Sequence, residues 1–222
     1  MKTIIITGAS DGLGKALAEI VLKNGNKAIC VSRSKCDLKG IENIVCDLAE
    51  PKQIDKAVAE IKAKFPKFDA LVNCAGNISV QKPNAITYDE MERVMKVNSL
   101  APMYLTSKLF DLIKQNEADI MNVGSTVGLK GYPDQCTYGT SKWAIRGTSI
   151  NYQMELAKTR CRVTQFNPGG MNTPFWDKYN GTKIQDPENW MKPSDVAQFM
   201  WQILNLPKQM EVLEVSVGRK TK

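Results

Sequence analysis

Tyr138 and Lys142, in the stretch YGTSK, have the residue types and the spacing that acid–base chemistry requires. The chain contains no histidine, the side chain that most often exchanges protons near neutral pH. On a helix, residues four positions apart lie on one face, about one turn from each other. An isolated phenol has a pKa of about 10, and a neighbouring ammonium favours its charged form. The pair predicts either an ordinary solvated helix face or a tyrosine that exchanges a proton with a ligand.

A second chemical signal lies near the N-terminus, where a short apolar run leads into TGASDGLG. Glycine allows tight turns and close approach to the backbone, and a helix that follows offers free N–H groups to a phosphate. The spacing of Gly8, Gly12 and Gly14 is not Gly-x-Gly-x-x-Gly, and no Gly-Lys-Ser/Thr follows, which disfavours a phosphoryl-transfer enzyme. The alternatives are a plain glycine turn and a nucleotide-binding segment, and we expect the second.

The elements that must position these residues alternate along the chain. Apolar runs predict strands at 2–7, 27–32, 41–46, 69–76, 118–125, 162–170 and 210–217. Helical spacing predicts helices over 13–21, 54–65, 137–158 and 193–204, and a capping box at Thr87 and Glu90 opens a further long helix. Such alternation predicts an α/β fold: a doubly wound parallel sheet of about seven strands with helices on both faces, the Rossmann fold. We expect one domain, 1–222, with ligands at the carboxyl ends of the strands.

Composition and charge exclude several other classes of protein. The net charge is +7, but the lysines are spread along the chain, so we expect no nucleic-acid partner. The six cysteines form no Cys-x-x-Cys pair and have no histidine partners, so no metal site is predicted. No apolar run is long enough for a membrane span, and the N-terminal run is too short for a secretory signal, so we expect a cytoplasmic protein. The GRKTK terminus is expected to be a solvated, frayed tail.

Motifs at several separated places then resemble the short-chain dehydrogenase/reductase family. The glycine segment reads Thr-Gly-x-x-x-Gly-x-Gly, and Tyr138 and Lys142 form Tyr-x-x-x-Lys. NCAG resembles the family's Asn-Asn-Ala-Gly, with Cys74 in place of the second asparagine. NPGGMNT resembles the segment that holds nicotinamide, and KPSDVA resembles the start of the last helix. The resemblance covers essentially the whole chain and implies a nicotinamide-dependent oxidoreductase.

The resemblance implies four catalytic residues, Asn98, Ser125, Tyr138 and Lys142. Tyr138 exchanges the proton, Ser125 holds the substrate oxygen, and Lys142 supplies positive charge and binds the cofactor ribose. Asn98 is the family's proton-relay position, with its carbonyl holding a water. Pro102, four residues later, lacks the N–H that would bond this carbonyl in a helix, although a simple helix kink would use the same proline.

The cofactor is expected to be NADP(H), with NAD(H) less favoured. An acid at the end of the second strand would accept the 2′-hydroxyl of NAD, but this strand ends in Arg33, which can bind a phosphate, with Lys35 adding charge. Asp11 weighs toward NAD, and Asp37 is a less favoured ribose partner. Asp47 and Leu48 are assigned to the adenine, the alternative for Asp47 being a helix cap. The predicted cofactor-binding residues are Gly8, Ser10, Asp11, Gly12, Leu13, Gly14, Arg33, Asp47, Leu48, Asn73, Ala75, Gly76, Tyr138, Lys142, Pro168, Gly169, Met171 and Thr173.

A looser segment at about 171–192 is expected to cover the substrate with Phe175, Trp176, Tyr179 and Trp190. These features predict an oxidoreductase that reduces a carbonyl compound to an alcohol, reversibly, as a homodimer or homotetramer. A catalytically silent NADP(H)-binding sensor is the main alternative, which the four catalytic residues disfavour. A sugar-nucleotide epimerase is a third reading, which the glycine spacing disfavours. A serine hydrolase is excluded because VGSTV is not Gly-x-Ser-x-Gly and no histidine base exists.

Overall fold

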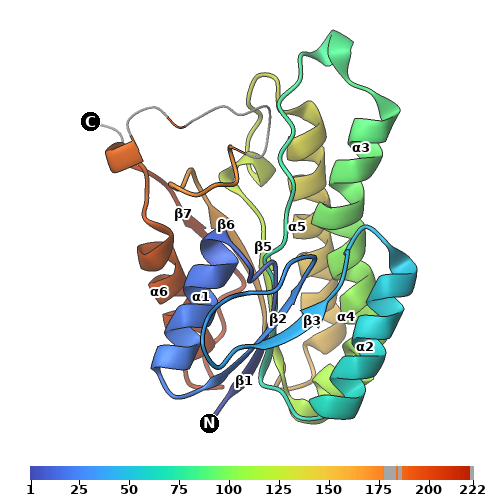
Figure 1. Ribbon diagram of the computed structural model, residues 1–222, viewed down its shortest axis with the longest axis vertical. Helices are drawn as coiled ribbons and strands as arrows, with labels where there is room; N and C mark the ends of the chain where they lie inside the picture. Colours follow the sequence, from blue (N-terminus) through green and yellow to red (C-terminus); the bar gives the residue numbers. More distant parts are fainter. Residues whose placement is uncertain (178–183, 185–186, 221–222) are drawn as a thin grey trace.

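Seven parallel strands form one sheet in the order β3-β2-β1-β4-β5-β6-β7. The computed structural model describes residues 1–177, 184 and 187–220. The central strands are short and apolar, and they are buried on both faces, as a parallel sheet covered by helices requires. The doubly wound α/β fold expected from the sequence is therefore confirmed (Figure 1). The strands are β1 (Thr3–Thr7), β2 (Lys27–Ser32), β3 (Glu42–Val45), β4 (Ala70–Asn73), β5 (Asp119–Val123), β6 (Val163–Pro168) and β7 (Glu214–Val217).

Helices cover the two faces of the sheet with different partners. Helices α1 (Gly12–Lys23) and α6 (Pro193–Leu204) pack together over one face, on the even-numbered apolar residues of β1. Helices α2 (Pro51–Lys64), α4 (Ala101–Asn116) and α5 (Cys136–Leu156) cover the other face, where Ile5 of β1 lies. Figure 1 shows these two groups on opposite sides of the strands. Right-handed crossovers of this kind bring the carboxyl ends of the strands to one edge.

The long helix expected to open at Thr87 is interrupted. Helix α3 (Tyr88–Met95) ends in a π-helical turn at Lys96–Leu100, after which α4 continues to Asn116. Thr87 Oγ1 accepts the Glu90 N–H at 3.3 Å as a capping threonine does, but the Glu90 carboxylate binds Arg93. Pro102 lies just beyond the π turn, and its missing N–H removes one helical hydrogen bond there.

The last strand is shorter than the expected 210–217 and begins only at Glu214. The N–H of Val163 in β6 donates to the side chain of Glu211 rather than to backbone. The carbonyl of Met210 accepts from the Arg162 guanidinium. Side chains therefore take the hydrogen bonds that would extend the ladder between β6 and β7, and the backbone there is not a strand.

Candidate active site

The glycine segment joins the end of β1 to the start of α1. Gly8 has a φ of +73°, and a Cβ there would lie 2.8 Å from the Ala75 Cα, so only glycine fits. Thr7 Oγ1 accepts the N–H groups of Cys74 and Ala75 at 3.0 and 3.1 Å. These contacts hold the loop after β1 against the loop after β4, which brings two of the predicted cofactor segments together.

Asp11 is the N-cap of α1. Its carboxylate accepts the Gly12 N–H at 2.7 Å, which uses one of the free donors at the helix start. The negative charge therefore lies at the helix end where the resemblance expects phosphate.

The end of β2 carries Arg33, between Ser32 and Ser34, and all three line the central cavity described below. Asp37 forms an ion pair with Lys15 and its side chain is 79% exposed. Neither Asp37 nor Lys35 lines the cavity. Of these charged residues after β2, only Arg33 lines the cavity, and its charge is positive.

Tyr138 and Lys142 lie on the buried face of α5, as their spacing predicts. Lys142 Nζ lies 5.6 Å from the centroid of the Tyr138 ring and donates to the Val123 carbonyl at 3.1 Å. Ser125 follows β5 and caps the short 3-10 turn Thr126–Gly128, where its Oγ accepts the Val127 N–H at 3.2 Å. Ser125 also lies close enough to Tyr138 to lower the pKa of the phenol. Three of the four predicted catalytic side chains are thus brought together.

Burial controls the proton equilibria of this group. Desolvation raises the pKa of Tyr138 to about 12, and Ser125 acts in the opposite direction. Desolvation also lowers the pKa of Lys142 to about 8. In the protein alone, burial therefore outweighs the effect expected from the neighbouring ammonium. The tyrosine keeps its proton at neutral pH, which suits a proton donor.

Asn98 lies in the π-helical turn, and its side chain braces the loop after β4. Its Nδ2 donates to the Asn77 carbonyl and to Ser141 Oγ, and its Oδ1 accepts the Asn77 N–H at 2.7 Å. A Cβ at Gly76 would lie 3.5 Å from Asn98 Oδ1 and 3.7 Å from Lys142 Nζ, so both side chains lie on the same side of Gly76. Asn98 does not itself line the cavity.

Asn73 differs from the other predicted cofactor residues because its side chain is buried between the sheet and α4. Its Nδ2 donates to Asn122 Oδ1 at 2.8 Å and to Thr106 Oγ1 at 3.3 Å. These bonds tie β4 to β5 and to α4. The side chain does not line the cavity. Its hydrogen bonds instead hold the end of β4 in place.

A cavity of about 630 Å³ opens along the carboxyl ends of the strands. Its walls include every predicted cofactor-binding residue except Asn73, together with Ser125, Phe175, Trp176 and Trp190. Asp47 lies in this wall, and its carboxylate accepts the Ala49 N–H at 3.0 Å. The alternative that Asp47 caps a helix is wrong, since the N-cap of α2 is Glu50.

The aromatic side chains of the looser segment form a row that begins at the tyrosine. Ring centroids lie 6.2 Å apart for Tyr138 and Phe175, 6.3 Å for Phe175 and Trp176, and 5.7 Å for Trp176 and Trp190. Tyr179, which we also expected over the substrate, lies outside the described residues. The row forms an apolar wall beside the group of Ser125, Tyr138 and Lys142.

The sequence missed two parts of the cavity wall. The loop after Ser125 contributes Lys130, Tyr132 and Gln135, which belong to no motif. The C-terminal segment contributes Gly218 and Arg219, and the guanidinium of Arg219 lies 4.8 Å from the Trp190 ring centroid. Arg219 is exposed, as expected for a solvated tail, but its contact with Trp190 contradicts the expectation that it is frayed. The Gly169 N–H donates to the Val217 carbonyl at 2.8 Å and holds the chain over the site.

Two other properties bear on ligands. Within the described part of the chain, no group of three or more His, Cys, Asp or Glu residues is arranged to hold a metal ion. None of the helices in the same residues is long and apolar enough to cross a membrane.

The chain is similar to known dehydrogenases in sequence and in structure. Residues 2–183 match the family described as short chain dehydrogenase. An oxidoreductase of Staphylococcus aureus, described as uncharacterized, is 25% identical over 226 residues, covering 97% of this chain and 96% of the relative.

Solved structures agree with the fold. An alcohol dehydrogenase from the archaeon Thermococcus sibiricus, complexed with 5-hydroxy-NADP, has a TM-score of 0.87 at 24% identity, covering 98% of this chain and 96% of that chain. A 3-ketoacyl-(acyl-carrier-protein) reductase from Brucella melitensis, complexed with NADH, has a TM-score of 0.86 at 25% identity with the same coverage of 98% and 96%. The two neighbours hold different forms of the nicotinamide cofactor.

Proposed function

Because the chain belongs to the short-chain dehydrogenase family, we propose that it is an NADP(H)-dependent oxidoreductase that reversibly reduces a carbonyl compound to an alcohol. The observation that carries the proposal is the cavity itself, since Ser125, Tyr138 and Lys142 line one end of the space that the glycine segment also lines. A pure sensor has no need of these three side chains together. The chemistry and the nucleotide-binding segment therefore belong to one site.

The shape and lining of the cavity fit a nicotinamide dinucleotide. Its wall runs from Arg33 after β2, past the glycine segment at the start of α1, to Pro168 and Gly169 after β6. This path crosses the carboxyl edge of the sheet where dinucleotides bind in doubly wound folds. A bound reduced nicotinamide supplies a hydride to the carbonyl carbon.

The side chains at the reacting end have separate tasks. Tyr138, whose pKa of about 12 keeps it protonated, donates its proton to the substrate oxygen. Ser125 donates a hydrogen bond to the same oxygen and holds it against the phenol. Lys142 binds the ribose and stabilises the phenolate that remains after proton transfer. Asn98, which lies on the same side of Gly76 as Lys142, is proposed to take part in the proton relay.

A buried acceptor supports a polar ligand at this end. Gln135 Oε1 is shielded from solvent and has no hydrogen-bond partner within the described residues. Gln135 lines the cavity, so a donor on the ligand, such as the hydroxyl of an alcohol, satisfies this oxygen.

The preference for NADP(H) over NAD(H) follows from Arg33. A guanidinium can bind the 2′-phosphate through two hydrogen bonds, whereas an acid at this position would repel it. The described residues from Ser32 to Lys35 contain no acid. Asp11 caps the start of α1, where we expect the pyrophosphate, whereas Arg33 follows β2, where we expect the 2′-phosphate. Asp11 therefore does not remove this preference.

The experiment that tests the function is a panel of ketones, aldehydes and quinones offered with NADPH and with NADH. Loss of absorbance of the reduced cofactor reports hydride transfer. We expect turnover of some members of the panel, faster with NADPH. Tight NADPH binding without turnover of any member would reject the enzyme and favour the sensor.

We also propose that the chain forms a homodimer or homotetramer through α4 and α5. Large apolar side chains are exposed on both helices: Met103 of α4 is 45% exposed, and on α5 Trp143 is 48% exposed, Ile150 49% and Met154 75%. The spacing of the last three along α5 puts them on one side of that helix. Light scattering at several protein concentrations tests this, and a monomer at all of them would reject the assembly.

A further inference from the structure

Arg219 is connected to the reacting tyrosine by a continuous row of aromatic rings. Its guanidinium lies 4.8 Å from the centroid of Trp190, and the rings of Trp176 and Phe175 complete the row to Tyr138. Three of these five residues belong to the looser segment, Tyr138 comes from α5 and Arg219 follows β7, and all five line the same cavity. The far end of the apolar wall is thus positively charged.

The charge at this end of the cavity is uncompensated by acids. Among the described residues that line the cavity, the acids are Asp11 and Asp47, which belong to the glycine segment and to the chain after β3. Lys130 adds a second cation, and within the described residues neither Lys130 nor Arg219 pairs with a carboxylate. The field at the Arg219 end of the aromatic row therefore favours an anion.

Trp190 holds the guanidinium in a way that leaves its hydrogen-bond donors available. A guanidinium over an aromatic face interacts through its charge, while its N–H groups point outward in its own plane. A carboxylate can accept two parallel hydrogen bonds from such a plane. Arg219 is exposed, and its contact with the indole places its guanidinium at the cavity wall.

We propose that the substrate carries a carboxylate, bound by Arg219, at the far end of an apolar or aromatic body from its carbonyl group. This inference rests on the proposed function, because it names the class of carbonyl compound that the same site reduces. The body lies along Phe175, Trp176 and Trp190, and the carbonyl oxygen meets Tyr138. In the reduction, a hydride adds to the carbonyl carbon, the C=O π bond breaks, and the oxygen takes the tyrosine proton.

A matched pair of aldehydes tests the proposal. 4-Formylbenzoate and its methyl ester have the same reacting group and the same aromatic body, and they differ in the distal charge. We expect the parent protein to have a kcat/KM at least about tenfold higher for the acid, because the ester lacks the charge that strengthens the hydrogen bonds of the guanidinium. Arg219→Gln should remove this preference and leave the ester within about threefold, and Arg219→Lys should keep part of it.

Lys220→Gln is the control, because it removes one positive charge from the neighbouring residue, which does not line the cavity. It should leave the acid preference unchanged. Binding of 4-(hydroxymethyl)benzoate and its methyl ester, measured by calorimetry on protein saturated with NADPH, repeats the comparison without turnover, because a reduced cofactor cannot accept a hydride from an alcohol. The acid should bind more tightly, and Arg219→Gln should abolish the difference.

Several results would overturn the proposal. Equal use of acid and ester by the parent, or an acid preference that survives Arg219→Gln, rejects Arg219 as the carboxylate receptor. A weaker affinity for NADPH in Arg219→Gln, with the acid preference intact, assigns the residue to the cofactor instead. If other carbonyl compounds are reduced but the acid is neither reduced nor bound, this inference fails and the proposed function stands. If no carbonyl compound is reduced, both fail.

Discussion

The α-carbon of Gly124 packs directly against the side-chain amide of Gln165. A Cβ at position 124 would collide with Gln165 Nε2 and with Asn167 Oδ1, which are themselves hydrogen-bonded at 2.7 Å. The Gly124 N–H donates to the Phe166 carbonyl at 2.7 Å. Because Gly124 immediately precedes Ser125, this contact fixes the position of Ser125 at the carboxyl end of β5.

The two amides cannot move aside easily, because they belong to a buried chain of hydrogen bonds. Ser149 Oγ donates to Gln165 Oε1 at 2.6 Å, and Asn167 Nδ2 donates to Glu214 Oε1 at 2.8 Å. Moving either amide leaves buried polar atoms without partners, which costs about 1–3 kcal/mol for each group.

Gly124→Ala should therefore displace Ser125 and lower kcat by roughly 10²-fold, the cost of a displacement of about 1 Å in an active site. Adding Gln165→Ala removes one colliding group and should restore part of the activity. Gly147→Ala is the control, since a Cβ there meets nothing within 4 Å. Steady-state kinetics with NADPH titration on each variant gives the measurement. A Gly124→Ala protein as active as the parent would disprove the positioning role.

Arg33→Asp should shift cofactor preference from NADPH toward NADH. The new carboxylate repels a 2′-phosphate and accepts a hydrogen bond from a 2′-hydroxyl. The ratio of kcat/KM for the two cofactors in parent and variant measures the shift. Lys39→Asp makes the same change of charge at an exposed residue outside the cavity and should leave the ratio unchanged. A parent that already prefers NADH contradicts the assignment.

The buried ammonium of Lys142 should make stability depend on pH. Its pKa is about 8 in the folded protein against an ordinary value of 10.5, so between these values the unfolded chain binds a proton that the folded chain does not. Lys142 alone contributes a rise in the free energy of unfolding with pH in this window, by up to about 1.4 kcal/mol per pH unit. The thiols of Cys46 and Cys74, whose pKa values burial raises to about 11 and about 12, contribute a fall above pH 9 in parent and variant alike. Below the window both states are protonated, and the cost of burying the charge is fully present.

Lys142→Met removes this group, so the stability of the variant relative to the parent should fall as pH rises from 8 to 10. Urea unfolding at several pH values up to 10 measures the difference, below the range where Tyr138 contributes with the opposite sign. A difference that does not change with pH would mean that the ammonium is not desolvated in the fold.

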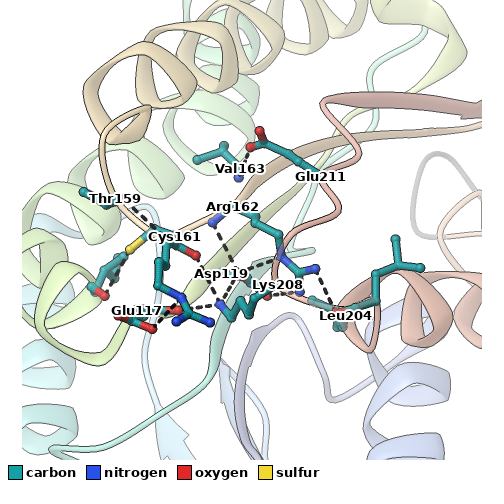
Figure 2. Close-up of polar contacts among 12 residues, drawn as sticks. Glu117, Asp119, Thr159, Cys161, Arg162, Val163, Leu204, Lys208 and Glu211 are labelled. Atoms are coloured by element: carbon teal, nitrogen blue, oxygen red, sulfur yellow. Dashed lines mark hydrogen bonds and ion pairs between the residues drawn. The ribbon is translucent and has the colours of Figure 1, made fainter.

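A second buried charge cluster lies far from the cavity, at the amino ends of β5 and β6. Figure 2 shows Asp119 between Arg162 and Lys208, with ion-pair distances of 2.6 and 2.7 Å. Arg162 also donates to the carbonyls of Leu206 and Met210 at 3.0 and 3.1 Å. The cluster thus anchors the segment that leads into β7 and on to Arg219.

Asp119→Asn should lower the free energy of unfolding by roughly 3–5 kcal/mol, because it leaves two cations without their carboxylate. Glu117→Gln is the matched comparison, since the Glu117–Arg160 pair is largely exposed and 3.3 Å long, and it should cost less than about 1 kcal/mol. Chemical unfolding of both variants provides the measurement. Equal losses would show that burial does not set the strength of the cluster.

The parts of the site that could be predicted from the sequence depend on local spacing. Tyr138 and Lys142 meet because four residues make about one helical turn. Ser125 joins them because it directly follows a strand, and the carboxyl ends of parallel strands share one edge. The glycine segment is also local, since it lies between a strand and the helix that follows.

The parts that could not be predicted depend on contacts between distant segments. Strands buried on both faces have no alternation of polar and apolar residues. The sequence therefore does not show that the Asn73 side chain points toward Thr106 of α4 instead of toward the cavity. Arg219 reaches Trp190 only because Gly169 binds Val217. The late start of β7 depends on Glu211 taking the Val163 N–H, a competition between a side chain and the backbone that leaves no pattern.

The most direct test of the whole account is single-turnover hydride transfer in Tyr138→Phe, paired with NADPH titration. The variant keeps the ring that packs against Phe175 and removes the hydroxyl, so fold and cofactor affinity should survive while hydride transfer falls by roughly 10²–10⁴-fold. Tyr104→Phe, which removes an exposed hydroxyl bound to Asp55, should transfer hydride at the parent rate. If Tyr138→Phe transfers hydride as fast as the parent with chemistry limiting, the phenol is not the proton donor.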